Sequence, residues 1–509
     1  MRRRFWLFGT ALAMTLGGAM GAAPALAQKS ADTLRVTWRD TIPNVDPYYN
    51  QLRNGLVLAH HVWDGLLHRD PETFQIKPLL AKSFRWVDET TLEFELRPNV
   101  KFHNGDALSA DDVVYTINAV VEDKKVSVPS NYAFIAGAER VDDLRVRIKL
   151  KRVFPAALEY LAMVTPIWPK AYRERVGPET YAKQPVGAGP YRLVQVDASN
   201  VIHLERFDGY YADSPKGRPA IGKIQIRQVA DPSTELNELI GGRADWIWKY
   251  NADQFDNINR LPNLMAQRAE SMRVGYVNMD AAGRTGAGNP FTNVKVRQAV
   301  FHAVDRAAMA KNLVQGGSRV PDAPCFPTQF GCDGTAAVKY DYNPEKARKL
   351  LAEAGFPNGF DTELVTYELP QWSGALQGYL HAVGIRAKIT QITVSAFVTR
   401  SLKGENPMEL GGWGSYSIND ASAILPQYFT GGGNDYARDA EVKAAVEAGG
   451  TTTDVDQRRK HYSQAIRLVT ERAYWLPMFT HSITYGHVRT LNFKPYPDEL
   501  PRFYLASWK

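Results

Sequence analysis

Cysteine is nearly absent from this sequence, which has only Cys325 and Cys332 among its 509 residues. The two lie close together in the segment P-C-F-P-T-Q-F-G-C. In an oxidising compartment, an isolated close pair predicts one local disulfide. A zinc site is the alternative, but the sequence lacks two further ligands at suitable spacing.

Long hydrophobic runs are also absent, except at the N-terminus. Residues 2–4 are arginines, an apolar stretch runs from Phe5 to about Ala23, and residues 25–27 form an A-L-A cleavage site. This pattern predicts a signal peptide over residues 1–27, exported by the Sec route or by the twin-arginine route. A membrane anchor is the alternative, although the run is short and ends in a cleavable motif. Because no cysteine lies near the cleavage site, we expect a soluble periplasmic protein without a lipid anchor.

The excess of positive over negative charge is also small. The formal net charge is +7, and loss of the leader with its three arginines lowers it to +4. A net charge this small on so long a chain affects solubility and does not indicate a nucleic-acid-binding surface. We therefore expect no nucleic-acid partner.

The sequence has no catalytic motif that we can identify. It lacks H-E-x-x-H, G-x-S-x-G and the Walker A pattern. His60 and His61 are adjacent, so on a helix their rings diverge by about 100° and cannot chelate one metal. Asp111 and Asp112 are predicted to serve a helix N-terminus. We expect no enzyme activity, no cofactor and no metal site.

Residues 91–115 show the local folding pattern most clearly. Apolar residues alternate with charged ones from Leu92 to Leu96, as in a half-buried strand. A turn at residues 98–99 and renewed alternation over 100–102 predict a hairpin. Ser109 and Asp112 then predict the capping box of a helix. Strand and helix patterns alternate along the rest of the chain, which indicates an α/β fold.

The same stretch resembles the signature of the family 5 extracellular solute-binding proteins, the peptide, nickel and opine class that serves ABC importers. The family pattern F-x-L-R-x-x-V-K-F-H-x-G-x-x-L-x-A-x-D-V is nearly complete here. Further family signatures lie at residues 185–191, 289–306 and 342–356, so the resemblance covers essentially the whole mature chain.

The resemblance implies a two-lobed periplasmic binding protein of type II, with an extra domain inserted in the N-terminal lobe. Transferred to this sequence, lobe I takes residues 28–70, 193–285 and 478–509. The inserted domain takes residues 71–192, and lobe II takes residues 286–477.

The resemblance also implies a function. A monomeric periplasmic receptor is expected to capture a peptide-like or other polar organic solute between its lobes and deliver it to an inner-membrane ABC permease. A dipeptide, an oligopeptide, an opine or a modified peptide would fit this class. The alternatives are a receptor for a metal chelate or an oligosaccharide, and a secreted hydrolase.

Trp413 is the first candidate for a ligand contact, because the family places a Trp in a G-W loop against its ligand. Peptide binders of the family carry an Asp three positions later, which pairs with the ligand amine, but here that position is Tyr416. Asp420 takes this role if the loop carries a one-residue insertion. A buried ammonium without a carboxylate loses roughly 3–5 kcal/mol, so a free peptide amine is disfavoured otherwise.

Six further residues are candidates for the cleft. Aromatic faces with polar tips suit a polar organic ligand, and guanidinium groups suit a ligand carboxylate. Ordinary packing or solvent exposure is the alternative for each. These residues are Tyr49, Tyr276, Trp372 (expected in a loop after Pro370), His481, Arg386 and Arg400.

Overall fold

The structure is a computed structural model that describes residues 32–40, 42, 44–50, 52–196 and 201–509. The predicted signal peptide lies outside the described residues. Within them, no helix combines the length and the apolar character needed to span a membrane.

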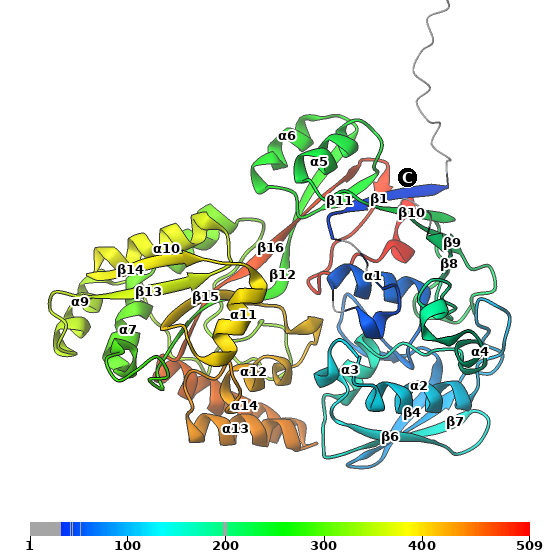
Figure 1. Cartoon of the computed structure of the whole chain (residues 1–509), viewed down its shortest axis with the longest axis horizontal. Coiled ribbons are helices and arrows are strands. Elements are labelled where there is room, and N and C mark those ends of the chain that lie inside the picture. Colours follow the sequence, from blue (N-terminus) through cyan, green and yellow to red (C-terminus); the bar gives the residue numbers. More distant parts are fainter. Residues whose placement is uncertain (1–31, 41, 43, 51, 197–200) are drawn as a thin grey trace, which may run out of the picture.

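Ten strands form one sheet that runs through both halves of the molecule (Figure 1). Neighbours in this sheet come from distant parts of the chain, since β1 pairs in parallel with β10 and β11 lies antiparallel to β16. The spatial order is β14 (Ile385–Gln391), β13 (Phe360–Thr366), β15 (Met408–Trp413), β12 (Leu264–Met279), β16 (Trp475–Val488), β11 (Trp246–Trp248), β1 (Thr33–Trp38), β10 (Lys223–Gln228), β9 (Ile202–Arg206) and β8 (Tyr191–Val196).

Two long antiparallel strands, β12 and β16, connect the halves (Figure 1). Their ladder is interrupted between Glu270 and Val274, and the register shifts again between Gly275 and Tyr276. Irregularities of this kind bend and twist a pair of strands. The connection between the halves is therefore a two-stranded ribbon with a local bend.

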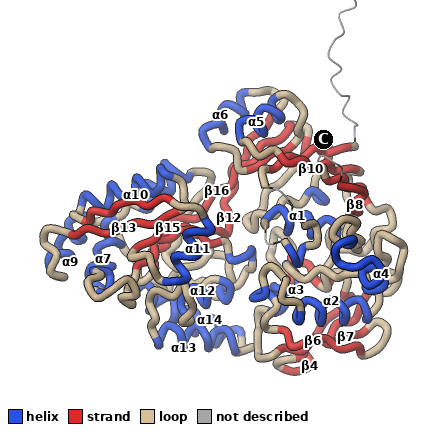
Figure 2. Tube along the Cα trace, viewed as in Figure 1, coloured by secondary structure: helices blue, strands red, loops and turns tan. Residues whose placement is uncertain are grey.

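We call the right-hand half of Figure 1 lobe I, and include in it the helices above the sheet and the C-terminal segment. A small four-stranded sheet lies at its far end with α2 packed beside it (Figure 2). The order of this sheet is β4 (Ala81–Asp88), β5 (Thr91–Leu96), β7 (Arg145–Leu150) and β6 (Ile135–Arg140). The other elements are α1 (Arg53–Val62), β2 (Leu67–Arg69), β3 (Ile76–Pro78), α2 (Ala110–Glu122), α3 (Ala157–Met163), α4 (Lys170–Tyr181), α5 (Pro232–Ile240), α6 (Phe255–Arg260), β17 (Leu491–Asn492) and β18 (Ser507–Trp508).

The prediction for residues 91–115 is confirmed in two parts and wrong in one. Strand β5 and helix α2 form as predicted, and the Ser109 N–H donates to Asp112 Oδ2 at 2.8 Å in a capping box. Residues 100–102 do not form a second strand, apart from one bridge between Lys101 and Ala107. The reason is that β4 and β7 already occupy both edges of β5.

We call the left-hand half of Figure 1 lobe II. Its strands β13–β15 are accompanied by helices on more than one side (Figure 2). The helices are α7 (Val294–Ala303), α8 (Arg306–Met309), α9 (Pro344–Glu353), α10 (Pro370–Ala382), α11 (Val394–Lys403), α12 (Leu425–Phe429), α13 (Ala440–Thr451) and α14 (Val455–Glu471). The alternation of strands and helices confirms the α/β prediction, whereas the residue boundaries of the lobes and of the inserted domain stay predictions.

The hydrophobic cores do not separate completely at the junction of the lobes. The large core of lobe I also includes Ile418 and Ala423 of lobe II. A lobe II cluster around Trp475 packs in turn against Phe74 of lobe I. The segment that follows β15 is therefore buried against both halves.

Candidate functional site

A cavity of about 210 Å³ lies between the lobes, and we call it the arginine cavity. Trp413, Gly414 and Tyr416 line it from lobe II, and the first turns of α1 and residues 127–132 line it from lobe I. Arg53 of α1 and Arg273 of β12 also line it, whereas no aspartate or glutamate does so among the described residues. The cavity thus presents two guanidinium groups and aromatic surface to a guest.

The two guanidinium groups share one buried carboxylate. Glu499 Oε2 lies 3.7 Å from Arg53 Nε, and Glu499 Oε1 lies 3.4 Å from Arg273 Nε. The charge of Lys249 acts on Glu499 as well. Asp498 also acts on Arg53, and Glu368 acts on Arg273, but neither acid lines the cavity. The charged side chains that the lining presents are therefore both positive, which favours an anionic guest.

The pKa values around Glu499 agree with this picture. Although burial acts to raise it, the charges of Arg273 and Arg53 lower the pKa of Glu499 to about 2, so the carboxylate is ionised at neutral pH. Glu499 raises the pKa of Arg273, whereas burial lowers the pKa of Arg53. Both guanidinium groups remain charged, because arginine does not deprotonate in proteins.

Other polar groups of the lining already have partners. The Tyr48 hydroxyl donates to the Pro166 carbonyl at 2.6 Å, and the Tyr132 hydroxyl donates to the Val164 carbonyl at 2.8 Å. The indole N–H of Trp413 donates to the backbone of lobe II at 3.3 Å. These three rings therefore offer apolar surface to a guest, and the arginines offer charge and hydrogen bonds.

The turn that carries Tyr416 has an unusual backbone. Ser415, Tyr416 and Ser417 have φ values of 51°, 49° and 65°, and none of them is a glycine. Such values are costly for residues with a side chain and persist where the surroundings hold them. The Tyr416 ring stands edge-on to Trp413, with ring centroids 5.0 Å apart and an angle of 80°.

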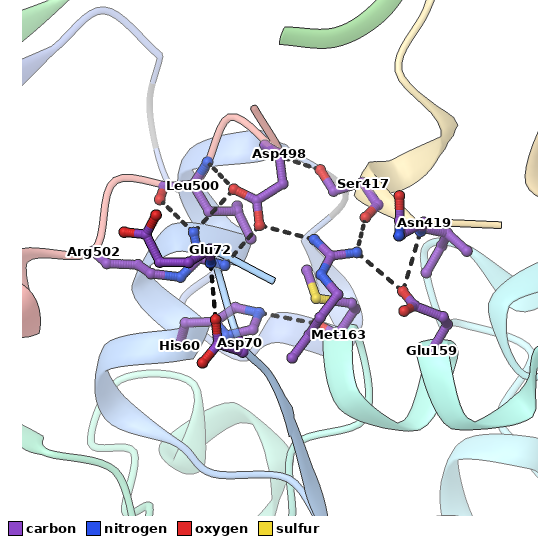
Figure 3. Close-up of polar contacts among 12 residues, drawn as sticks. His60, Asp70, Glu72, Glu159, Met163, Ser417, Asn419, Asp498, Leu500 and Arg502 are labelled. Atoms are coloured by element: carbon purple, nitrogen blue, oxygen red, sulfur yellow. Dashed lines mark hydrogen bonds and ion pairs between the residues drawn. The ribbon is translucent and has the colours of Figure 1, made fainter. Parts of the chain in front are cut away.

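Contacts between the lobes hold this turn (Figure 3). The Ser417 hydroxyl donates to the Asp498 carbonyl at 2.6 Å, and the Asn419 N–H donates to Glu159 at 3.1 Å. The Arg69 guanidinium donates to the Ser417 carbonyl, to Glu159 at 3.0 Å and to the Asp498 carboxylate at 2.8 Å. The turn of lobe II that bears Tyr416 is thus tied to lobe I.

The predicted disulfide between Cys325 and Cys332 is confirmed, and its loop supports the same turn from within lobe II. The side-chain amide of Gln329 donates to the Ile418 carbonyl at 2.8 Å. The Phe330 N–H donates to the Asn419 carbonyl at 3.0 Å. The disulfide loop therefore fixes the backbone directly after Tyr416.

The structure gives Asp420 a partner other than a ligand. Both carboxylate oxygens of Asp420 accept hydrogen bonds of 3.0 Å from Arg458 Nη2, and the two side chains are buried. Asp420 also accepts a hydrogen bond from the Ser422 N–H at 2.9 Å. It lines no part of the arginine cavity, so the predicted contact between Asp420 and a ligand amine has no support in this geometry.

Arg386 and Arg400 also have partners outside the cavity. Arg386 pairs with the exposed Asp361 at 2.8 Å across the edge of the sheet, and Arg400 pairs with Glu363 at 2.9 Å. Neither arginine lines the arginine cavity. Their guanidinium groups are matched by carboxylates of lobe II.

None of the four remaining predicted residues lines the arginine cavity. The Tyr49 hydroxyl donates to Asp123 at 2.7 Å. Tyr276 is stacked on Trp475 at 4.6 Å. The expectation of a loop at Trp372 is wrong, because Pro370 starts α10 and Trp372 is buried in its first turn, 5.0 Å from the ring of His481.

Of the predicted contacts, the structure brings Trp413 and Tyr416 together at the cavity and leaves the others outside it. Arg53 and Arg273 line the cavity but were not among the predicted contacts. Arg53 begins α1, and Arg273 lies at the irregularity of β12, 220 positions further along the chain. No sequence motif connects them, since only the folded sheet brings them to one carboxylate. Among the described residues, no cluster of three or more His, Cys, Asp or Glu side chains is placed to hold a metal ion.

Comparison with known proteins agrees with this architecture. The profile of the bacterial extracellular solute-binding proteins, family 5 Middle, matches residues 75–436, which is more than half of the chain. The glutathione-binding protein GsiB of Pectobacterium atrosepticum is 27% identical over 530 residues and covers 98% of each chain. The heme-binding protein A of Haemophilus influenzae is 26% identical, over 84% of this chain and 83% of that protein.

A solved structure shows the same two-lobed fold. HbpA2 from Haemophilus parasuis matches with a TM-score of 0.81 and 24% sequence identity, over 94% of this chain and all of that one. The expectation of a type II periplasmic binding protein is thereby confirmed. The chain belongs to family 5 of the bacterial extracellular solute-binding proteins, which are substrate-binding components of ABC importers.

Proposed function

We propose that this protein is the periplasmic receptor for a peptide-like solute that carries a carboxylate. The arginine cavity is the observation that carries the proposal. Arg53 and Arg273 share only Glu499, and no acidic residue among those described lines the cavity. A ligand carboxylate between the two guanidinium groups balances the excess charge, whereas a ligand ammonium finds no partner there.

Relatives support a carboxylate-bearing ligand. Two of them are named for glutathione and for heme, and both compounds carry carboxylates. The arginine cavity, at about 210 Å³, is of a size to take the acid end of such a ligand. Trp413 and Tyr416 form its aromatic walls, so they hold the body of the ligand while the arginines hold its acid group.

The proposed cycle uses movement of the lobes. The ligand enters the open cleft, the lobes close around it, and the closed form docks on the inner-membrane permease. The signal peptide over residues 1–27 directs the monomeric protein to the periplasm. The predicted boundaries of lobe I, the inserted domain and lobe II belong to this proposal.

Native mass spectrometry and calorimetry test the proposal. The purified protein is titrated with glutathione, acidic dipeptides and tripeptides, an opine and heme, and with the amide of each peptide acid as a matched neutral compound. We expect at least one free acid to bind and its C-terminal amide to bind far more weakly. Failure of every carboxylate to bind would overturn the proposal, and so would covalent change of the bound compound.

A further inference from the structure

A second cavity of about 330 Å³ adjoins the arginine cavity. Asn131, Trp413 and Tyr416 line both, so the two share walls. By itself the arginine cavity is smaller than the range of about 300–1,000 Å³ typical of small-molecule sites, and the joined cavities fall within that range. Taken together, the two adjoining cavities therefore have the size of a small-molecule site.

The second cavity differs from the first in its charges. Arg152 lines it from lobe I, and Glu447 of α13 lines it from lobe II. Arg152 makes no ion pair with any other residue that the structure describes. Glu447 has only a loose pair with Lys443, at 3.8 Å. One charge of each sign is thus available at the second cavity, whereas both available charges at the first are positive.

Tyr416 belongs to the wall that the two cavities share. The residue is 38% exposed and lines both cavities, although its backbone is held by the contacts of Ser417 with lobe I. The charged side chains line one cavity each, Arg53 and Arg273 the first, Arg152 and Glu447 the second. A ligand that occupies both cavities would therefore carry its charged groups at its two ends.

We infer that the ligand is an extended acid with a carboxylate at one end and an amino-acid zwitterion at the other. The carboxylate lies between Arg53 and Arg273, and the zwitterion places its carboxylate at Arg152 and its ammonium at Glu447. Peptides joined through a side-chain carboxyl group have such ends, because they keep a free ammonium and a free carboxylate on one carbon. This inference rests on the proposed function and names the substrate class of the same site.

The second cavity also accounts for the missing acidic residue after Trp413. Tyr416 occupies that position, and Asp420 is bound by Arg458. In the inferred arrangement the ligand amine lies further out, against α13, where Glu447 replaces that lost partner. The amine of the ligand then binds in a different part of the cleft from its acid group.

A binding cycle tests the inference with two probes. Reduced glutathione has the zwitterionic end, whereas cysteinylglycine lacks the side-chain-linked glutamate that carries it and has an ordinary free amine on its cysteine instead. Both are titrated by calorimetry into the wild type and into the double variant Arg152→Ala/Glu447→Ala. The double variant Arg386→Ala/Asp361→Ala, which removes an exposed pair outside both cavities, is the matched control.

We expect the Arg152→Ala/Glu447→Ala variant to lose about 10- to 100-fold in affinity for glutathione, because two charged contacts are removed. Its affinity for cysteinylglycine and both affinities of the control should stay unchanged. Equal losses for the two probes, or no loss for glutathione, would overturn the inference. If the wild type binds another acidic peptide but not glutathione, the inference fails and the proposed function stands; if it binds no carboxylate at all, both fail.

Discussion

Arginines inside and outside the cleft differ in how their charge is balanced. Arg400 and Arg386 each have a carboxylate of their own in lobe II, at 2.9 and 2.8 Å. Arg53 and Arg273 have to share Glu499 and lie further from it, at 3.7 and 3.4 Å. Less complete neutralisation therefore distinguishes the two arginines that line the cavity from the two that do not.

The buried pair of Asp420 and Arg458 gives the largest expected effect. Asp420→Asn leaves Arg458 buried without its carboxylate, which should lower the free energy of unfolding by about 3–5 kcal/mol. Urea unfolding measures this change. The affinity of the folded variant for the ligand should equal that of the wild type. If Asp420→Asn instead had the stability of the wild type but lost affinity, Asp420 would be a ligand contact after all.

Removing one arginine of the cavity should affect binding more than folding. Arg273→Gln leaves Arg53 alone with Glu499, so the local excess of charge falls. We expect affinity for a carboxylate ligand to fall by about 2–5 kcal/mol, or about 30- to 5,000-fold. Calorimetry with the tightest acid of the panel measures this. Unchanged affinity would contradict the role given to the arginine cavity.

Glu368 is the opposite case, a buried carboxyl group without a cation of its own. Burial raises the pKa of Glu368 to about 7, against the influence of Arg273. Its protonated form is favoured by folding, so its contribution to stability is complete below the ordinary pKa and is lost as the pH rises through about 7. Glu368→Gln should therefore gain roughly 2–3 kcal/mol relative to the wild type between about pH 5 and about pH 8.5.

Denaturant unfolding at several pH values checks this prediction. The wild type should lose stability across the neutral range, and the variant should lose less. Glu95→Gln is a suitable control, because that carboxylate is on the exposed face of the small sheet and pairs with Lys82. A gap between wild type and Glu368→Gln that is constant with pH would rule out titration of Glu368.

Glu499→Gln should change the affinity for an acidic ligand in the opposite direction to Arg273→Gln. The substitution removes the one carboxylate that Arg53 and Arg273 share, so a ligand carboxylate gains their full charge. We expect affinity for the acid to rise by about tenfold, equivalent to about 1.4 kcal/mol. The increase should disappear for the amide of the same ligand. A weaker acid interaction in Glu499→Gln would show that Glu499 orients the arginines more than it neutralises them.

Arg400→Gln should have the smallest effect and serves as the matched control for Arg273→Gln. Its pair with Glu363 is partly exposed, and such pairs contribute about 0.2–1 kcal/mol. Ligand affinity should not change, since Arg400 does not line the cavity. A loss of affinity comparable to that of Arg273→Gln would remove the distinction between matched and unmatched arginines.

Patterns among neighbouring residues predicted those helices and strands whose formation depends mainly on neighbouring residues. The strand around Leu92–Leu96 and the Ser109–Asp112 capping box form as predicted, because periodicity and caps depend on near neighbours. The second strand at residues 100–102 does not form, because whether a strand edge is free depends on β4 and β7. Trp372 was predicted in a loop because proline was read as a break, although proline also suits the first turn of a helix.

The candidate site divides in the same way. Trp413 was predicted from a resemblance to a short family motif, and Tyr416 was identified by its spacing from Trp413. Arg53 and Arg273 could not be predicted from local patterns. The carboxylate of Glu499 that they share comes from the C-terminal segment, and the folded sheet brings the two arginines close to it. Asp420 shows the converse, since no local pattern indicates its partner Arg458 on α14.

The irregularity in β12 has a mechanical consequence. Residues 271–273 interrupt its ladder with β16, so the ribbon between the lobes bends where Arg273 is attached. Under the proposed function, a carboxylate held by Arg273 and by Arg53 of α1 would connect this bend to lobe I. The angle between the lobes would then depend on whether an acid is bound, and the permease would recognise that angle without touching the ligand.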